Sequence, residues 1–121
     1  SQLNFEIVSS QYDGFNYSFA KFFRDGFGDK EALIFIGGAF QDIRSSYKIC
    51  RELSQSFDVI CIELPGSGNS DPLPECYGFE FLADLLHDLI SSLKLDIIHV
   101  IGCSYGSPIG YKLAQKHPKY S

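Results

Sequence analysis

The sequence predicts an α/β protein with a mostly parallel sheet, an N-terminal antiparallel hairpin and helices on both faces of the sheet. Three continuous apolar runs are typical of strands covered on both sides. Each run is followed by a stretch in which apolar residues recur with helical spacing. Right-handed crossovers between such strands place the helices on both faces. All 121 residues, 1–121, are expected to form part of one domain, because this length is too short for two.

The hairpin is predicted at the start of the chain. Residues Leu3–Val8 alternate apolar and polar side chains, as a half-exposed strand does. Asp13-Gly14 is a turn signal, and the aromatic-rich segment Phe15–Phe23 follows as the second strand.

Strands and helices alternate through the rest of the chain. The predicted buried strands are Ala32–Ile36, Asp58–Leu64 and Asp96–Ile101, and the predicted helices are Ile43–Phe57, Phe79–Leu95 and Tyr105–His117. In parallel sheets, ligands bind beyond the carboxyl ends of the strands. Glycine-bearing turns follow all three strands, at Gly37-Gly38, at Pro65-Gly66 and between Gly102 and Gly106. We therefore expect the functional site at this edge.

Composition excludes several classes of function. The net charge is −5 and no Lys/Arg cluster occurs, which argues against binding to nucleic acid or to an anionic membrane. No apolar run approaches the roughly 20 residues of a membrane span, and no signal peptide opens the sequence. The four cysteines, Cys50, Cys61, Cys76 and Cys103, form no C-x-x-C pair and are expected to be small buried side chains in a reduced, cytoplasmic protein.

The segment Gly102-Cys103-Ser104-Tyr105-Gly106 carries the most specific chemistry. A nucleophilic serine must stand clear of the sheet on a sharp, strained strand-to-helix turn, and residues two before and two after it must be small because chain and helix crowd together there. The N–H groups at the start of the following helix point to where an oxyanion would form. The alternative is an ordinary Gly/Ser turn between a strand and a helix.

These segments together resemble the N-terminal portion of an α/β-hydrolase, from about Phe5 to the last residue. The pentapeptide at Ser104 is similar to the nucleophile elbow of that family. Three further segments match in order: Gly37-Gly38-Ala39-Phe40 is similar to the H-G-x-x turn after strand three, Glu63–Ser70 to the D-x-x-G-x-G-x-S loop after strand four, and Lys116–Tyr120 to the end of the elbow helix. Gly37 stands in place of His, and Glu63 in place of an Asp that is usually structural.

The resemblance implies a serine hydrolase that attacks an ester, thioester or amide carbonyl and passes through an acyl-enzyme. It implies Ser104 as nucleophile and the backbone N–H groups of Tyr105 and Ala39 as oxyanion donors. Gly38 and Phe40 would border the small acyl-type substrate. No organic cofactor or metal is implied. A dehalogenase is disfavoured, because dehalogenases of this fold use Asp where Ser104 stands.

A general base is not evident within the chain. His99 is predicted to pack against the sheet, His87 to be a partly buried helix residue, and His117 to end the last helix about three turns from Ser104. The family supplies its catalytic acid and histidine after the elbow helix, so this chain alone is expected to be inactive. The alternative is a non-catalytic binding or assembly module derived from the same fold.

Two further expectations concern the surface. Residues 96–101 would form an apolar edge strand, which soluble proteins avoid exposing, so a second polypeptide or a second copy of the chain is expected to cover it. Polar residues near the Pro65 turn are expected to be ordinary loop residues, namely Ser67, Ser70, Asp71 and Glu75. Cys103 is expected to be a spacer whose side chain points away from Ser104.

Overall fold

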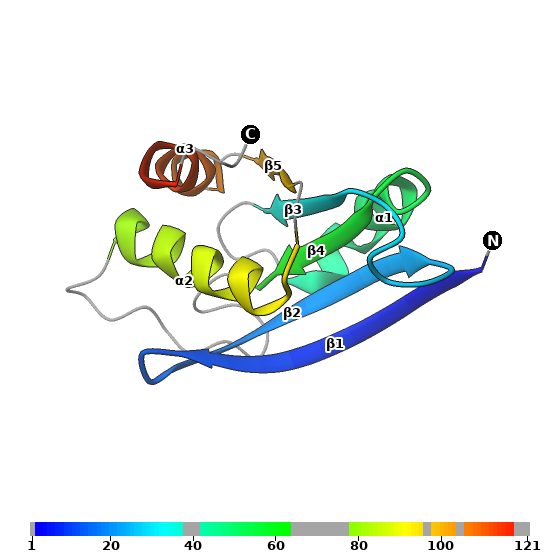
Figure 1. Cartoon of the computed structure of the whole chain (residues 1–121), viewed down its shortest axis with the longest axis horizontal. Coiled ribbons are helices and arrows are strands. Elements are labelled where there is room, and N and C mark those ends of the chain that lie inside the picture. The colour runs from blue at the N-terminus through cyan, green and yellow to red at the C-terminus, as the bar shows by residue number, and fades with distance from the viewer. Residues whose placement is uncertain (1, 38–41, 64–77, 96–97, 104–105, 118–121) are drawn as a thin grey trace.

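The computed structural model describes residues 2–37, 42–63, 78–95, 98–103 and 106–117. It contains an α/β arrangement of five strands and three helices in these residues (Figure 1). The strands are β1 (Leu3–Tyr12), β2 (Phe15–Arg24), β3 (Ala32–Ile36), β4 (Asp58–Ile62) and β5 (Ile98–Gly102). The helices are α1 (Ile43–Leu53), α2 (Phe79–Ser92) and α3 (Gly106–Lys116).

The strands form one mixed sheet in the order β1-β2-β4-β3-β5. β3 is parallel to both β4 and β5, whereas β2 is antiparallel to β1 and to β4. The predicted parallel core and N-terminal hairpin are therefore confirmed. Because β3, β4 and β5 run in the same direction, their carboxyl ends meet at one edge of the sheet.

The hairpin turn lies at the predicted dipeptide. Asp13 has φ 50° and Gly14 has φ 79°, the left-handed pair of angles that suits a two-residue hairpin loop. Pairing continues to the last residue before the turn, where Tyr12 is opposite Phe15. The first strand thus extends beyond the predicted end at Val8, since backbone pairing with β2 continues through residues 9–12 although their side chains break the apolar alternation.

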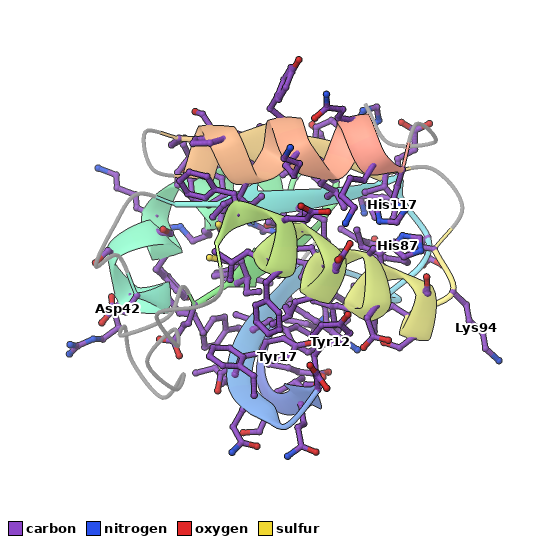
Figure 2. All side chains as sticks on the ribbon, turned by 90° about the vertical axis from the view of Figure 1, so that its left-hand side faces the viewer. Tyr12, Tyr17, Asp42, His87, Lys94 and His117 are labelled. Carbon is purple, nitrogen blue, oxygen red and sulfur yellow. The ribbon has the colours of Figure 1, made fainter. Side chains whose placement is uncertain are left out.

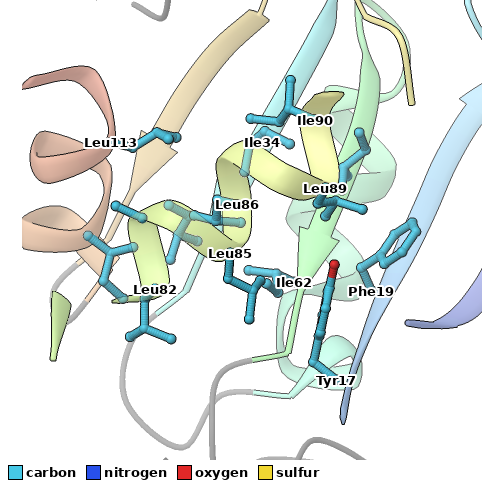
Figure 3. Packing of buried hydrophobic residues seen from close by; sticks show 14 of the residues in the cluster. Tyr17, Phe19, Ile34, Ile62, Leu82, Leu85, Leu86, Leu89, Ile90 and Leu113 are labelled. Atoms are coloured by element: carbon cyan, nitrogen blue, oxygen red, sulfur yellow. The ribbon is translucent and has the colours of Figure 1, made fainter. Parts of the chain in front are cut away.

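The helices cover both faces of the sheet, as predicted (Figure 1). On one face α2 and α3 pack on alternate residues of the strands, among them Ile34 and Ile62 (Figure 3). On the other face α1 packs on the intervening residues, among them Leu33 and Val59. All five residues of β3 and all five of β4 are buried, which explains the apolar runs Ala32–Ile36 and 59–62. The buried Asp58 at the start of β4 accepts a hydrogen bond from the Gly28 N–H.

Two helices end earlier than the spacing of apolar residues predicts. α1 ends at Leu53 rather than Phe57, because the chain turns through residues 54–57 to enter β4 at Asp58. α2 ends at Ser92 rather than Leu95, since Lys94 adopts φ 55° and breaks the helix. Apolar residues continue past both helix ends, so periodicity alone overestimates these lengths.

An ion-pair cluster joins the last turn of α3 to the beginning of α2. Lys116 Nζ lies 2.8 Å from Glu80 Oε1 and 2.9 Å from Asp84 Oδ1. The hydrogen bond from Lys116 lowers the pKa of Glu80, and the two carboxylates raise the pKa of Lys116. This contact links residues 36 positions apart at the surface, where an ion pair adds little to the apolar packing of the two helices.

Candidate functional site

The turn between β5 and α3 is the centre of the candidate site. Residues 104 and 105 lie outside the described residues, but both flanks are defined. The Cys103 N–H donates to Ile36 O of β3 at 2.9 Å, and the Gly106 N–H donates to Cys103 O at 2.9 Å. The Ser107 hydroxyl donates to Gly102 O at 2.8 Å. These bonds tie the end of β5 to the first residues of α3 and to the end of β3.

Crowding of backbone against backbone requires glycine on both flanks of this turn. A Cβ on Gly102 would lie 2.5 Å from Gly106 O and 2.9 Å from Ser107 Cα. A Cβ on Gly106 would collide with Ile36 O and lie 2.8 Å from Gly37 O. The crowding predicted two residues before and two after position 104 is therefore confirmed. Neither glycine is among the described residues with positive φ, so lack of space, not an unusual conformation, explains them.

The same contacts bring the ends of β3 and β5 together. Gly106 approaches the carbonyl groups of Ile36 and Gly37, the last described residues before the turn after β3. The described residues that precede the predicted oxyanion donors and the predicted nucleophile, Gly37 and Cys103, therefore follow neighbouring strands at the same edge of the sheet. The predicted site residues themselves, Ser104, Tyr105, Gly38, Ala39 and Phe40, lie outside the described residues, and their roles stay predictions.

Glu63 occupies the corresponding position after β4. Its side chain is buried, and its Oε2 accepts a hydrogen bond from the Ile43 N–H at 3.4 Å, at the start of α1. Its own backbone N–H donates to Ser18 O at 3.0 Å. These bonds give Glu63 a structural role, as the resemblance implies. The loop that follows, with Ser67, Ser70, Asp71 and Glu75, is outside the described residues.

Each histidine has a partner away from the turn. His99 Nε2 lies 2.8 Å from Glu31 Oε1, and its ring meets the ring of Phe57 at 5.4 Å. His87 is half-buried on α2 and stacks on His117, with ring centroids 3.6 Å apart and planes 1° from parallel (Figure 2). The stack lies at the far end of α3 from the candidate nucleophile. Sequence spacing did not reveal it, because it depends on how α3 crosses α2.

The described cysteines are free thiols packed on the α1 face. Cys50 and Cys61 are buried, whereas Cys103 is half-buried against the same cluster, on the face opposite to α3. A hydrogen bond with Cys61 and burial raise the pKa of the Cys50 thiol, which keeps it protonated and unreactive. Cys76 lies outside the described residues.

Two other findings bear on the class of site. In the described part of the chain, no group of three or more His, Cys, Asp or Glu side chains is placed to hold a metal ion. None of the helices within residues 42–63, 78–95 and 106–117 has the length and apolar character needed to cross a bilayer.

Comparison with known proteins identifies the family. A family model of the alpha/beta hydrolase fold matches residues 31–120. The chain belongs to this family. The matched region includes every strand and helix that meets at the β5–α3 turn. The crowded glycines at this turn are thus part of a known fold.

Relatives of this α/β-hydrolase chain include hydrolases of different kinds. A fluoroacetate dehalogenase of Burkholderia sp is 26% identical over 96 residues, which is 75% of this chain and 32% of that protein. An uncharacterised hydrolase of Saccharomyces cerevisiae is 35% identical over 68 residues, 54% of this chain and 23% of that protein. The chain spans about a third or less of the length of these curated relatives.

Solved structures show the same fold. The epoxide hydrolase CorEH superposes with a TM-score of 0.83 at 20% identity, covering 97% of this chain and 40% of that chain. A haloalkane dehalogenase variant from Bradyrhizobium elkanii superposes with a TM-score of 0.80 at 20% identity, covering 96% and 38% respectively. At this identity the likeness shows the fold alone.

Proposed function

We propose that this α/β-hydrolase chain carries the nucleophile of a serine hydrolase that acts on an ester, thioester or amide carbonyl. Ser104 attacks the carbonyl, and the backbone N–H groups of Tyr105 and Ala39 stabilise the oxyanion. The carrying observation is that Gly102 and Gly106 are packed so closely against backbone that no other side chain fits. The reactions named for the dehalogenase and the epoxide hydrolase are those of the relatives and are not assigned to this chain. A serine at position 104 favours acyl transfer.

The general base is proposed to come from residues outside this chain. His87, His99 and His117 each have another partner in the described structure, as given above. A serine hydroxyl reacts poorly until a base within hydrogen-bond reach removes its proton. The isolated chain is therefore expected to be inactive, and the reduced, cytoplasmic setting predicted from its cysteines is part of the same proposal.

Labelling with a fluorophosphonate probe tests this function. In the native assembly, we expect the probe to modify Ser104 and the Ser104→Ala variant to lose at least about 100-fold in labelling rate, since an activated nucleophile is removed. Ser67→Ala, which removes a serine of the segment after β4, should label like the unaltered protein. Peptide mass spectrometry locates the adduct. If labelling were lost in Ser67→Ala but kept in Ser104→Ala, the reactive serine would be Ser67 and not Ser104.

A binding or assembly module is the second candidate, and the exposed side of β5 favours it. β5 is the last strand of the described sheet, and only Ile98 is buried in it, whereas β3 and β4 are buried throughout. We propose that a second polypeptide or a second copy of the chain pairs with this edge.

Native mass spectrometry measures that association. We expect a species heavier than the 13.6 kDa of the chain. A stable monomer of 13.6 kDa in the isolated material would contradict the association. An associated species that does not react with the fluorophosphonate would favour the module over the enzyme.

A further inference from the structure

A cavity of about 550 Å³ lies on the α1 face of the sheet, at the N-terminus of α1. Its size is within the range of small-molecule sites. We call it the α1 pocket; the lining residues used below are Phe5, Ile7, Asp42, Arg44, Tyr47 and Glu63. It lies at the β1 end of the sheet, whereas the elbow contacts lie between β3 and β5. None of the described residues of the β5–α3 turn lines it.

The pocket forms because α1 does not cover β1. The core on this face is made by β2, β3, β4 and α1. Phe5 and Ile7 point to the same face, opposite Phe22 and Ala20 in the register. They nevertheless remain 38% and 55% exposed. These two apolar side chains thus give the pocket an open apolar floor.

Aromatic rings form one wall. The Phe5 and Tyr47 rings are 5.3 Å apart at 72°, and both contact the buried Phe22 ring at 4.9 and 5.4 Å. Three rings that pack on one another are held in place before any ligand binds. Aromatic faces carry negative electrostatic potential and attract organic cations.

Two carboxylates also line the pocket. Glu63 is 5% exposed, and the side chain of Asp42 is 22% exposed. Asp42 is labelled in Figure 2. Hydrogen bonds from the Ser45 backbone and hydroxyl lower the pKa of Asp42, so it is ionised at neutral pH. The Arg44 side chain is 93% exposed, and its Nε lies 3.4 Å from Asp42 Oδ2.

The balance of charge in the pocket is negative. Among the described lining residues, two carboxylates stand against one guanidinium and the roughly half positive charge at the N-terminus of α1. The Arg44 guanidinium is almost fully hydrated, so solvent screens it more than it screens the buried Glu63. A cation with an apolar body is recognised by an apolar floor, an aromatic wall and nearby carboxylates.

We propose that the α1 pocket binds an organic ammonium ion, with its apolar body on Phe5, Ile7 and Tyr47 and its positive charge near Glu63 and Asp42. Both carboxylates already accept hydrogen bonds from the start of α1. A quaternary ammonium group suits them best, because it needs charge and aromatic contact but no hydrogen-bond acceptor.

NMR titration of the full chain with benzyltrimethylammonium tests the proposal. We expect saturable shifts of backbone amides around the pocket and an affinity at least tenfold higher than that of neopentylbenzene, its neutral isostere. Glu63→Gln should weaken binding of the cation about fivefold and leave the isostere unchanged. Arg44→Gln should strengthen cation binding about twofold, because it removes the only basic side chain among the lining residues.

A charge-matched control separates local from general effects. Lys48→Gln makes the same change of charge on an exposed position of α1 outside the pocket, and we expect it to leave the affinity unaltered. If Glu63→Gln fails to fold, the Arg44→Gln and Lys48→Gln pair still decides. The proposal would be overturned by equal affinity for benzyltrimethylammonium and neopentylbenzene, or by tighter binding of benzoate than of benzyltrimethylammonium. It would also be overturned by an equal effect of Arg44→Gln and Lys48→Gln on cation affinity, or by the absence of any saturable shift.

Discussion

Gly106→Ala is expected to destabilise the protein by at least about 3 kcal/mol, a loss that places it among the severe single substitutions. The added methyl group would overlap Ile36 O and press on Gly37 O. Both atoms belong to backbone, and Ile36 O also accepts the Cys103 N–H, so neither moves without disturbing the β3–β5 pairing. Urea denaturation followed by circular dichroism measures the change.

Gly110→Ala is the matched control in the same helix. Its Cβ would lie 3.2 Å from Val100 Cγ1, a tight contact with a side chain and not with backbone, and 3.9 Å from Ile36 Cδ1. Alanine also gains about 1 kcal/mol of helix propensity over glycine, which offsets the tighter packing. We expect stability within about 1 kcal/mol of the unaltered chain. Similar losses at positions 106 and 110 would mean that helix packing, not the crowded turn, requires the glycine.

Local sequence signals predicted the elements that depend on near neighbours. Ala32–Ile36 was predicted with its observed bounds because five consecutive apolar residues are buried on both faces. The turn at Asp13-Gly14 was predicted because both residues tolerate positive φ. The crowding at Gly102 and Gly106 followed from the demands of a nucleophile turn, before it was evident which backbone they approach.

Features that depend on strand order could not be predicted in the same way. Ile36 becomes the neighbour of Gly106 only because β3 lies beside β5 in the sheet. The bond from Lys116 to Asp84 and the stack of His87 on His117 depend on the path of α3 across α2. The α1 pocket depends on how far one helix covers the sheet. Each is a long-range consequence that periodicity does not encode.

Leu86→Ala is expected to cost about 3–4 kcal/mol, in the upper part of the range for buried leucines. Leu86 is 1% exposed and belongs to the core between α2, α3 and the sheet (Figure 3). Its loss leaves a cavity, because the neighbouring Leu85, Leu89 and Ile90 are themselves buried and held by other contacts. Thermal and urea unfolding of the full chain measure the effect.

Leu93→Ala provides the comparison, because the spacing of apolar residues places Leu93 on the same face as Leu86. Leu93 is the C-cap residue directly after Ser92, the last residue of α2, and it is only partly buried against the core. Solvent can fill the space that its side chain leaves, so we expect a loss of about 1 kcal/mol. If Leu86→Ala and Leu93→Ala lost the same stability, the burial of Leu86 at the centre of α2 would not explain how this helix is held on the sheet. A larger loss at Leu86 means that the core between α2 and α3 supports α3, the helix that begins at Gly106 after the β5–α3 turn.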